Sequence, residues 1–138
     1  MLREAWMSLR LSGAYRYPTH VDCLENVLVQ LHSPKTVRLY PPHQVTNFSP
    51  DPDNKHWPSA SPSQRARAED HRWEAHLEPG DALYLPLMWL HGVEADDWSV
   101  SANVYLYTGT EDVWEKYKRK KKWPGWKVYE LDQGRKIC

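Results

Sequence analysis

The stretch YPTHVDCLENVLVQLHSPKTVRLYPP, Tyr17–Pro42, decides how this chain folds. It contains two apolar runs rich in β-branched residues, Val27–His32 and Thr36–Tyr40, and such runs are typical of strands. The Ser33-Pro34 pair between the runs predicts a turn. Pro41-Pro42 ends the second run, because proline cannot donate to a sheet ladder. The stretch therefore predicts two consecutive strands.

A histidine and an aspartate, His20 and Asp22, stand just before these strands. In an extended chain they point to the same side, because side chains alternate with period two. Together they supply two of the three ligands of the 2-His-1-carboxylate site that holds Fe(II) in non-heme oxygenases. The second histidine must come from elsewhere, and His91 in GDALYLPLMWLHGVEA is the candidate. The alternative for His91 is a hydrogen-bonded histidine of the core.

Length and composition indicate one soluble domain of 138 residues. Its 18 basic and 18 acidic residues cancel, so the overall charge predicts no particular partner. We expect no membrane span, since no apolar stretch approaches the roughly 20 residues needed. Met1–Trp6 lacks the apolar segment of a signal peptide, so we expect an intracellular protein, cytoplasmic or nuclear. Cys23 and Cys138 are far apart in sequence and are expected to be free thiols.

Short strands separated by proline and glycine predict an all-β barrel. The further strands are expected at Ser8–Ser12, Ala14–Thr19, Trp73–Leu77, Ala82–Leu85, Trp89–Val93 and Val100–Tyr107. Residues 43–72 are rich in Pro, Ser, Asp and Asn without a sustained period, which predicts an irregular loop. Such a loop is either functional or solvated and partly disordered, and the sequence leaves both open.

The last segment, 110–138, has a different pattern. Thr110 is a suitable N-cap, Glu111 and Asp112 follow it, and basic residues cluster near the other end. These features predict a C-terminal helix up to about Lys122, followed by a basic tail.

The segments HVDCLENVLVQLHSPKTVRLYPP and LEPGDALYLPLMWLHGVEADDWSVSANVY resemble the JmjC-type, cupin-like oxygenases that depend on Fe(II) and 2-oxoglutarate. Within that family the chain most resembles the tRNA wybutosine-synthesising hydroxylases, from about Leu9 to Tyr105. The resemblance implies a double-stranded β-helix, a jelly-roll barrel, over residues 1–109. It also implies that the loop 43–72 is an insertion over the active-site mouth, and that C-terminal helices pack on the barrel or build a homodimer.

The resemblance also implies roles for individual residues. The metal ligands for Fe(II) would be His20, Asp22 and His91. Lys35 would pair with the far carboxylate of 2-oxoglutarate, and an ammonium inside a barrel is costly without such an anionic partner. The remaining positions implied to lie near this cosubstrate are Asn26, Asn103 and Tyr17. For Asn26, a turn residue that opens a strand is an equal alternative.

The resemblance implies a hydroxylase acting on a C–H bond of a modified guanosine in tRNA. Trp57 in the loop and the basic residues Lys120, Lys121 and Lys122 would contact that substrate. A solvated helix end and a targeting signal are the alternative explanations of the basic run. One alternative function is a JmjC-type protein side-chain hydroxylase. Another is a truncated, non-catalytic cupin-like binding module, because the chain starts almost directly at the first barrel strand.

Overall fold

The structure is a computed structural model that describes residues 4–22, 24–48, 71–109, 129–131 and 135–137. The predicted helix over 110–122 lies outside the described residues. The same holds for the four residues expected to contact the substrate. Those contacts are Trp57, Lys120, Lys121 and Lys122.

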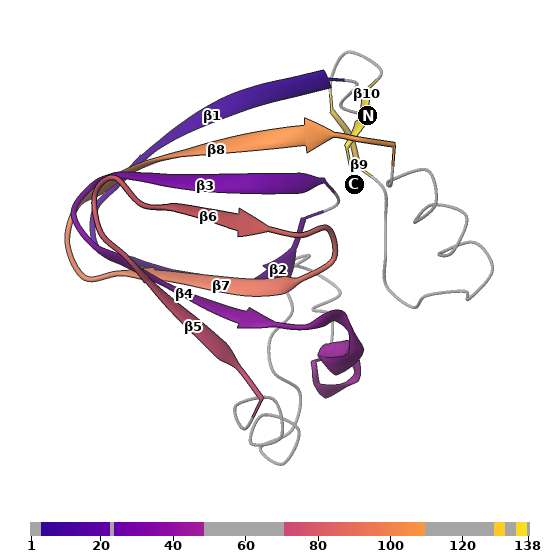
Figure 1. Ribbon diagram of the computed structural model, residues 1–138, viewed down its shortest axis with the longest axis horizontal. Coiled ribbons are helices and arrows are strands. Elements are labelled where there is room, and N and C mark those ends of the chain that lie inside the picture. Colours follow the sequence, from indigo (N-terminus) through magenta and orange to yellow (C-terminus); the bar gives the residue numbers. More distant parts are fainter. Residues whose placement is uncertain (1–3, 23, 49–70, 110–128, 132–134, 138) are drawn as a thin grey trace.

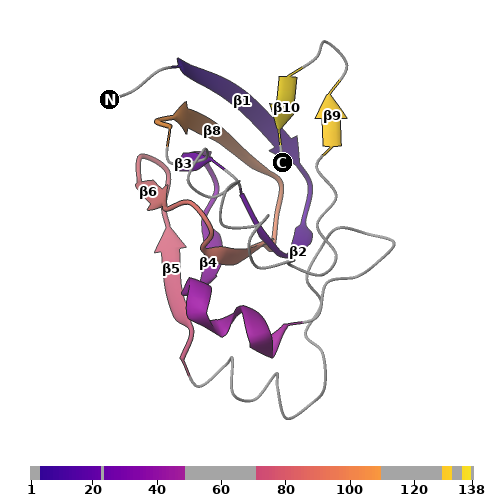
Figure 2. The ribbon, with the colours of Figure 1, turned by 90° about the vertical axis from the view of Figure 1, so that its right-hand side faces the viewer.

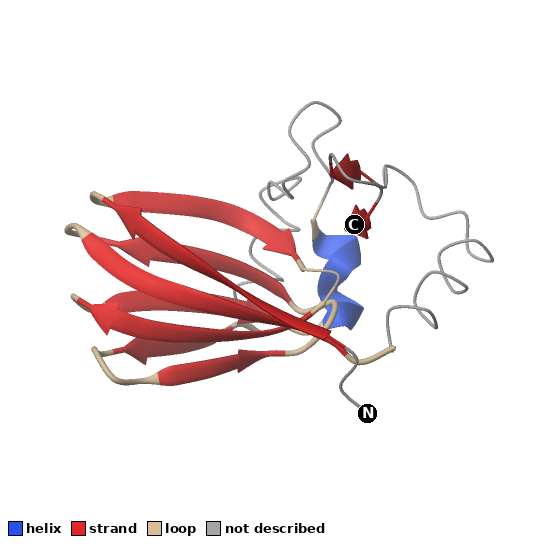
Figure 3. Ribbon diagram, turned by 90° about the horizontal axis from the view of Figure 1, so that it is seen from above, coloured by secondary structure: helices blue, strands red, loops and turns tan. Residues whose placement is uncertain are grey.

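Two four-stranded antiparallel sheets face each other and form the body of the molecule (Figure 1, Figure 3). One sheet has the order β1 (Glu4–Ser12), β8 (Ser99–Tyr107), β3 (Glu25–His32), β6 (Ala82–Leu85). The other has the order β2 (Tyr15–Val21), β7 (Leu90–Ala95), β4 (Lys35–Tyr40), β5 (Trp73–Leu77). The chain passes repeatedly from one sheet to the other, which is a jelly-roll arrangement. The predicted all-β fold is confirmed.

A short strand pair, β9 (Tyr129–Leu131) with β10 (Arg135–Ile137), lies outside these sheets. Among the residues that the structure describes, no helix is long and apolar enough to cross a bilayer.

Period-two alternation explains which side chains fill the interior. Along β3, Asn26, Leu28 and Gln30 are buried, whereas the residues between them are half-buried. The apolar core is a cluster of Leu28, Val37, Leu77 and Leu85. All four of these residues come from β3, β4, β5 and β6, and Val93 of β7 packs against them.

The turns follow the expected chemistry. Gly80 has a φ of +103°, and the Asp81 carboxylate accepts a hydrogen bond of 2.8 Å from the Glu78 backbone N–H. The segment Glu78–Asp81, which contains a proline and a glycine, therefore forms the turn between β5 and β6.

Two segments differ from the expectation. Strand β1 begins at Glu4 rather than Ser8, and it pairs with β8 over its whole length. Where the sequence predicted only an irregular loop, a 3-10 helix, η1 (Pro42–Asn47), follows β4 (Figure 2). Buried Gln44 anchors η1, because its side-chain amide donates to the His71 backbone carbonyl at 3.1 Å.

Candidate metal centre

Pairing of β2 with β7 brings two histidines together. His20 and His91 are cross-strand partners, and the centroids of their rings lie 4.2 Å apart. The register of β2 shifts between Tyr17 and His20, so this strand carries an irregularity next to the pair. Gly92 on β7 allows this strand to lie close to Thr19 on β2, because an added Cβ at Gly92 would lie 3.3 Å from the Thr19 hydroxyl oxygen.

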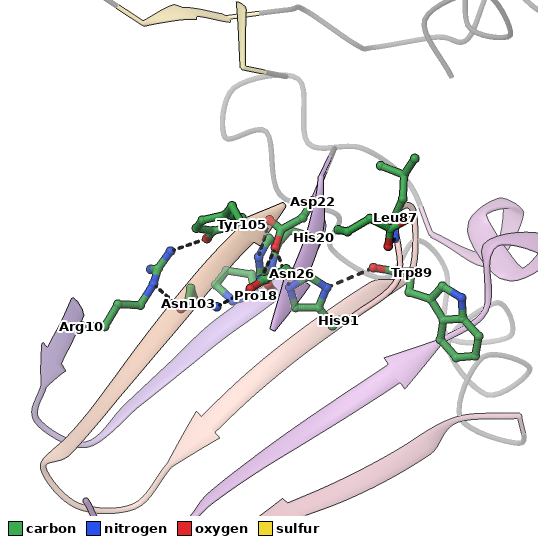
Figure 4. Close-up of polar contacts among 11 residues, drawn as sticks. Arg10, Pro18, His20, Asp22, Asn26, Leu87, Trp89, His91, Asn103 and Tyr105 are labelled. Atoms are coloured by element: carbon green, nitrogen blue, oxygen red, sulfur yellow. Dashed lines mark hydrogen bonds and ion pairs between the residues drawn. The ribbon is translucent and has the colours of Figure 1, made fainter. Parts of the chain in front are cut away.

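Backbone carbonyls orient both imidazole rings. His20 Nδ1 lies 2.9 Å from the Pro18 carbonyl oxygen, and His91 Nδ1 lies 3.0 Å from that of Trp89 (Figure 4). A carbonyl oxygen only accepts, so each Nδ1 carries the proton and each Nε2 carries the lone pair in the neutral ring. Hydrogen bonds of this kind hold metal-binding histidines in position.

Asp22, just past the end of β2, completes the group. Its carboxylate oxygens lie 3.9 Å from His20 Nε2 and 3.7 Å from His91 Nε2. The three possible ligand atoms all lie within 4.8 Å of one another. The backbone carbonyl of Asp22 accepts a hydrogen bond of 3.3 Å from the Met88 N–H. The segment that leads into β7 therefore also holds Asp22.

The donor set fits a divalent transition metal. Two imidazole nitrogens and one carboxylate oxygen on one side of an ion leave its remaining positions open to small ligands, as in mononuclear iron oxygenases. The three side chains line a cavity of about 400 Å³ between the sheets. An ion held here would face that cavity.

The cavity also contains the other residues that the sequence placed near the metal. Tyr17, Asn26, Lys35 and Asn103 all line it. Asn26 is not a turn residue, because it lies within β3 and is 1% exposed. Its side-chain amide donates to Asp22 Oδ2 at 2.8 Å, and it accepts from Asn103 Nδ2 at 3.2 Å. Their roles toward a cosubstrate stay predictions.

Lys35 is a buried cation that lines the cavity. It is 3% exposed, and its ammonium donates to the Ser101 hydroxyl at 2.8 Å. Burial first, and then the nearby charge of Arg10, lower the pKa of Lys35 to about 8. No carboxylate of the described residues forms an ion pair with it. The ammonium is therefore suited to an anion that enters the cavity.

Two residues of this site were missed by the sequence reasoning. Ser101 was not considered, although it alternates with Asn103 along β8 and so faces the same way. Arg10 was also not considered. Its guanidinium donates to Asn103 Oδ1 at 3.0 Å and to the Tyr105 hydroxyl at 3.2 Å. Alternation with Ser8 and Ser12 on β1 was the available signal for it.

The chain is similar in sequence to a known protein family and to several known proteins. Residues 3–112 match the family described as the cupin-like domain. The tRNA wybutosine-synthesizing protein 4 of Gibberella zeae is 34% identical over 104 residues, which cover 71% of this chain and 10% of that protein. The tRNA wybutosine-synthesizing protein 5 of Homo sapiens is 29% identical over 99 residues, which cover 63% of this chain and 29% of that protein. The chain thus spans less than a third of either relative.

Among solved structures, a hydroquinone 1,2-dioxygenase from Sphingomonas sp. TTNP3 shares the fold. The TM-score is 0.51 and the sequence identity is 13%, and the match covers 75% of this chain and 60% of that one. At this identity the likeness concerns the fold alone.

Proposed function

The chain belongs to the family of cupin-like domains, and from that premise we propose that it is an Fe(II)- and 2-oxoglutarate-dependent hydroxylase. In this proposal His20, Asp22 and His91 hold the iron, and Lys35 binds the far carboxylate of 2-oxoglutarate. The reaction oxidises 2-oxoglutarate to succinate and carbon dioxide and adds one oxygen atom of O₂ to a C–H bond of the substrate.

One observation carries the proposal. The three possible ligand atoms converge within 4.8 Å of one another on the wall of a cavity that also holds a buried lysine. A metal site alone fits many cupin-like proteins. Lys35, a buried cation on the cavity wall that forms no ion pair with a carboxylate of the described residues, adds the requirement for an anionic ligand.

The bound iron would supply the oxidising chemistry, and the chain supplies binding and orientation. The carbonyl contacts of Pro18 and Trp89 keep His20 and His91 in the tautomer that offers Nε2. Asp22 contributes the negative charge that partly neutralises a divalent ion. Lys35 and Ser101 fix the far end of the dicarboxylate, so that its 2-oxo acid end is directed toward the metal.

We propose a modified guanosine of tRNA as the substrate, in the wybutosine pathway. The names of the relatives support this choice, and the chain has a basic run at Lys120–Lys122 that could bind phosphates. The alternative is a protein side chain.

Incubation of the protein with Fe(II), 2-oxoglutarate, O₂ and tRNA that carries wybutosine precursors separates the two substrate classes. Mass spectrometry should detect one added oxygen atom in the digested nucleosides, and His91→Ala should produce none. Oxidation of peptides but not of tRNA would favour the protein hydroxylase.

Salt dependence gives a second test of the tRNA substrate. The triple variant Lys120→Gln, Lys121→Gln, Lys122→Gln should bind tRNA more weakly. Its slope of log affinity against log salt should flatten by roughly 2, given about 0.7 per phosphate contact on single-stranded nucleic acid. Arg16→Gln, on the surface of the barrel, is the single-charge control. An unchanged slope in the triple variant would contradict a role for this run in tRNA binding.

A further inference from the structure

Arg10 connects the edge strand β1 to the interior of the barrel. The residue as a whole is exposed, yet it lines the metal-site cavity. Its Nε donates to Asn103 Oδ1 at 3.0 Å, and its Nη2 donates to the Tyr105 hydroxyl at 3.2 Å (Figure 4). No described carboxylate forms an ion pair with Arg10. The two printed hydrogen bonds of the guanidinium therefore both go to neutral side chains.

The contact with Asn103 starts a chain of three hydrogen bonds that ends on a proposed metal ligand. Arg10 donates to Asn103, Asn103 Nδ2 donates to Asn26 Oδ1 at 3.2 Å, and Asn26 Nδ2 donates to Asp22 Oδ2 at 2.8 Å. We call these four side chains the amide relay. Figure 4 shows it crossing the space between β1 and the end of β2.

The chemistry of its two ends gives the relay a single orientation. A guanidinium has only donors and an ionised carboxylate has only acceptors, whereas each amide has one end of each kind. If the Asn103 amide were turned over, its NH₂ would face the guanidinium. If the Asn26 amide were turned over, its oxygen would face Asp22. Both ends therefore require the orientation observed.

We propose that Arg10 is a positioning residue of the metal centre, which acts through Asn103 and Asn26 to hold the Asp22 carboxylate in its ligating orientation. The proposal rests on the proposed function, since it assumes that Asp22 binds a metal. Hydrogen bonds to ligating carboxylates commonly change metal affinity tenfold to a hundredfold.

The proposal predicts a change opposite in sign to that expected from charge alone. Arg10 is a cation near a site for another cation, so simple repulsion predicts that its removal tightens metal binding. Loss of the relay predicts weaker binding, because Asn103 and Asn26 are then free to turn over and Asp22 loses its fixed orientation. The sign of the effect decides between the two.

The test uses Co(II) as a spectroscopic and calorimetric probe of the site. Arg10→Met removes the donors and keeps the length of the side chain, and it should weaken Co(II) binding by about tenfold or more. Arg10→Lys, which keeps one donor group, should recover part of that loss. Arg16→Met is the matched control, because Arg16 is exposed on β2 and pairs with Glu94 at 2.6 Å. That variant should leave the affinity within about twofold.

A double-mutant cycle separates the relay from a general structural effect. If Arg10 acts through Asn26, then Arg10→Met should change Co(II) affinity much less in an Asn26→Ala background than in the unaltered chain. Equal or tighter binding in Arg10→Met, or equal effects in both backgrounds, would overturn the relay while leaving the proposed metal centre intact. Failure of the unaltered chain to bind Co(II) at all would overturn both.

Discussion

The two halves of the barrel interior differ in chemistry. The apolar half is the cluster of Leu28, Val37, Leu77 and Leu85, which come from β3, β4, β5 and β6. The polar half is the cavity with the histidine pair and Asn103, which residues of β1, β2, β7 and β8 line together with Asn26 of β3 and Lys35 of β4. Within this one barrel, stability and ligand binding thus depend on different residues. Substitutions in the two halves should therefore have separable effects.

The largest expected effect is the loss of metal binding from the polar half. His20→Ala, Asp22→Ala and His91→Ala each remove one of three proposed ligands, and each should abolish binding of Fe(II) at stoichiometric concentrations. The free energy of unfolding without metal should change little, because none of these side chains belongs to the apolar cluster. Iron analysis and urea unfolding measure the two quantities. Full iron content in all three variants would contradict the assignment of the ligands.

Leu77→Ala should produce the reverse result in the apolar half. Leu77 is 5% exposed in the core, and truncation of a buried leucine typically costs about 2–5 kcal/mol of unfolding free energy. Urea unfolding measures this loss, and Co(II) titration of the folded variant should give an unchanged affinity. A strong loss of metal affinity with normal stability would show that the two halves are not separable.

Lys35→Ala should separate metal binding from cosubstrate binding within the polar half. We expect the metal affinity to stay nearly constant, because Lys35 is not a ligand. The affinity for 2-oxoglutarate should fall by about 2–5 kcal/mol, the usual cost when one partner of a buried charge pair is removed. Lys35→Arg should also bind more weakly, since the two cations differ in shape. Titration of the Fe(II) form with 2-oxoglutarate measures both, and an unchanged affinity in the Ala variant would remove Lys35 from this role.

A smaller effect concerns pH. Burial and the charge of Arg10 lower the pKa of Lys35 to about 8 in the unliganded protein, and an anion binds only the protonated ammonium. The affinity for 2-oxoglutarate should therefore be constant well below pH 8 and fall by up to about tenfold per pH unit above it. Lys35→Arg, whose charge persists, should flatten this profile. An equally steep decline in the Arg variant would assign the titration to another group.

The lowered pKa of Lys35 also makes the free energy of unfolding depend on pH. Above about pH 8 this free energy rises with pH, whereas the affinity for 2-oxoglutarate falls. Between about pH 8 and 10.5, the ordinary pKa of a lysine, the unfolded chain binds the proton of this side chain and the folded chain has released it. This group therefore makes the unliganded protein more stable as the pH rises through that window. The variant Lys35→Met should lack this rise in the free energy of unfolding between about pH 8 and 10.5, which urea unfolding at several pH values measures.

Much of the fold could be predicted from the sequence. The strands expected at Val27–His32 and Thr36–Tyr40 are present as β3 and β4, because β-branched runs between prolines leave few alternatives. The start of β1 was missed. Met7, Leu9 and Leu11 alternate along β1, and such an apolar pattern predicts that these side chains point inward. In the structure all three are exposed.

The site could be predicted only in part. Period two places His20 and Asp22 on one side, but the distance between His20 and His91 depends on the pairing of β2 with β7, which no local pattern encodes. Their association came from the family resemblance. Arg10 escaped notice because its role depends on contacts with β8, far away in the sequence.

The most direct test of the central claim is the absorption spectrum of the protein with Fe(II) and 2-oxoglutarate under anaerobic conditions. Chelation of the iron by the 2-oxo acid should give a metal-to-ligand charge-transfer band in the unaltered protein. The band should be absent in His91→Ala, and it should need far more 2-oxoglutarate in Lys35→Ala. No band in the unaltered protein at saturating concentrations, or an equal band in His91→Ala, would contradict the claim that this cavity is an iron and 2-oxoglutarate site.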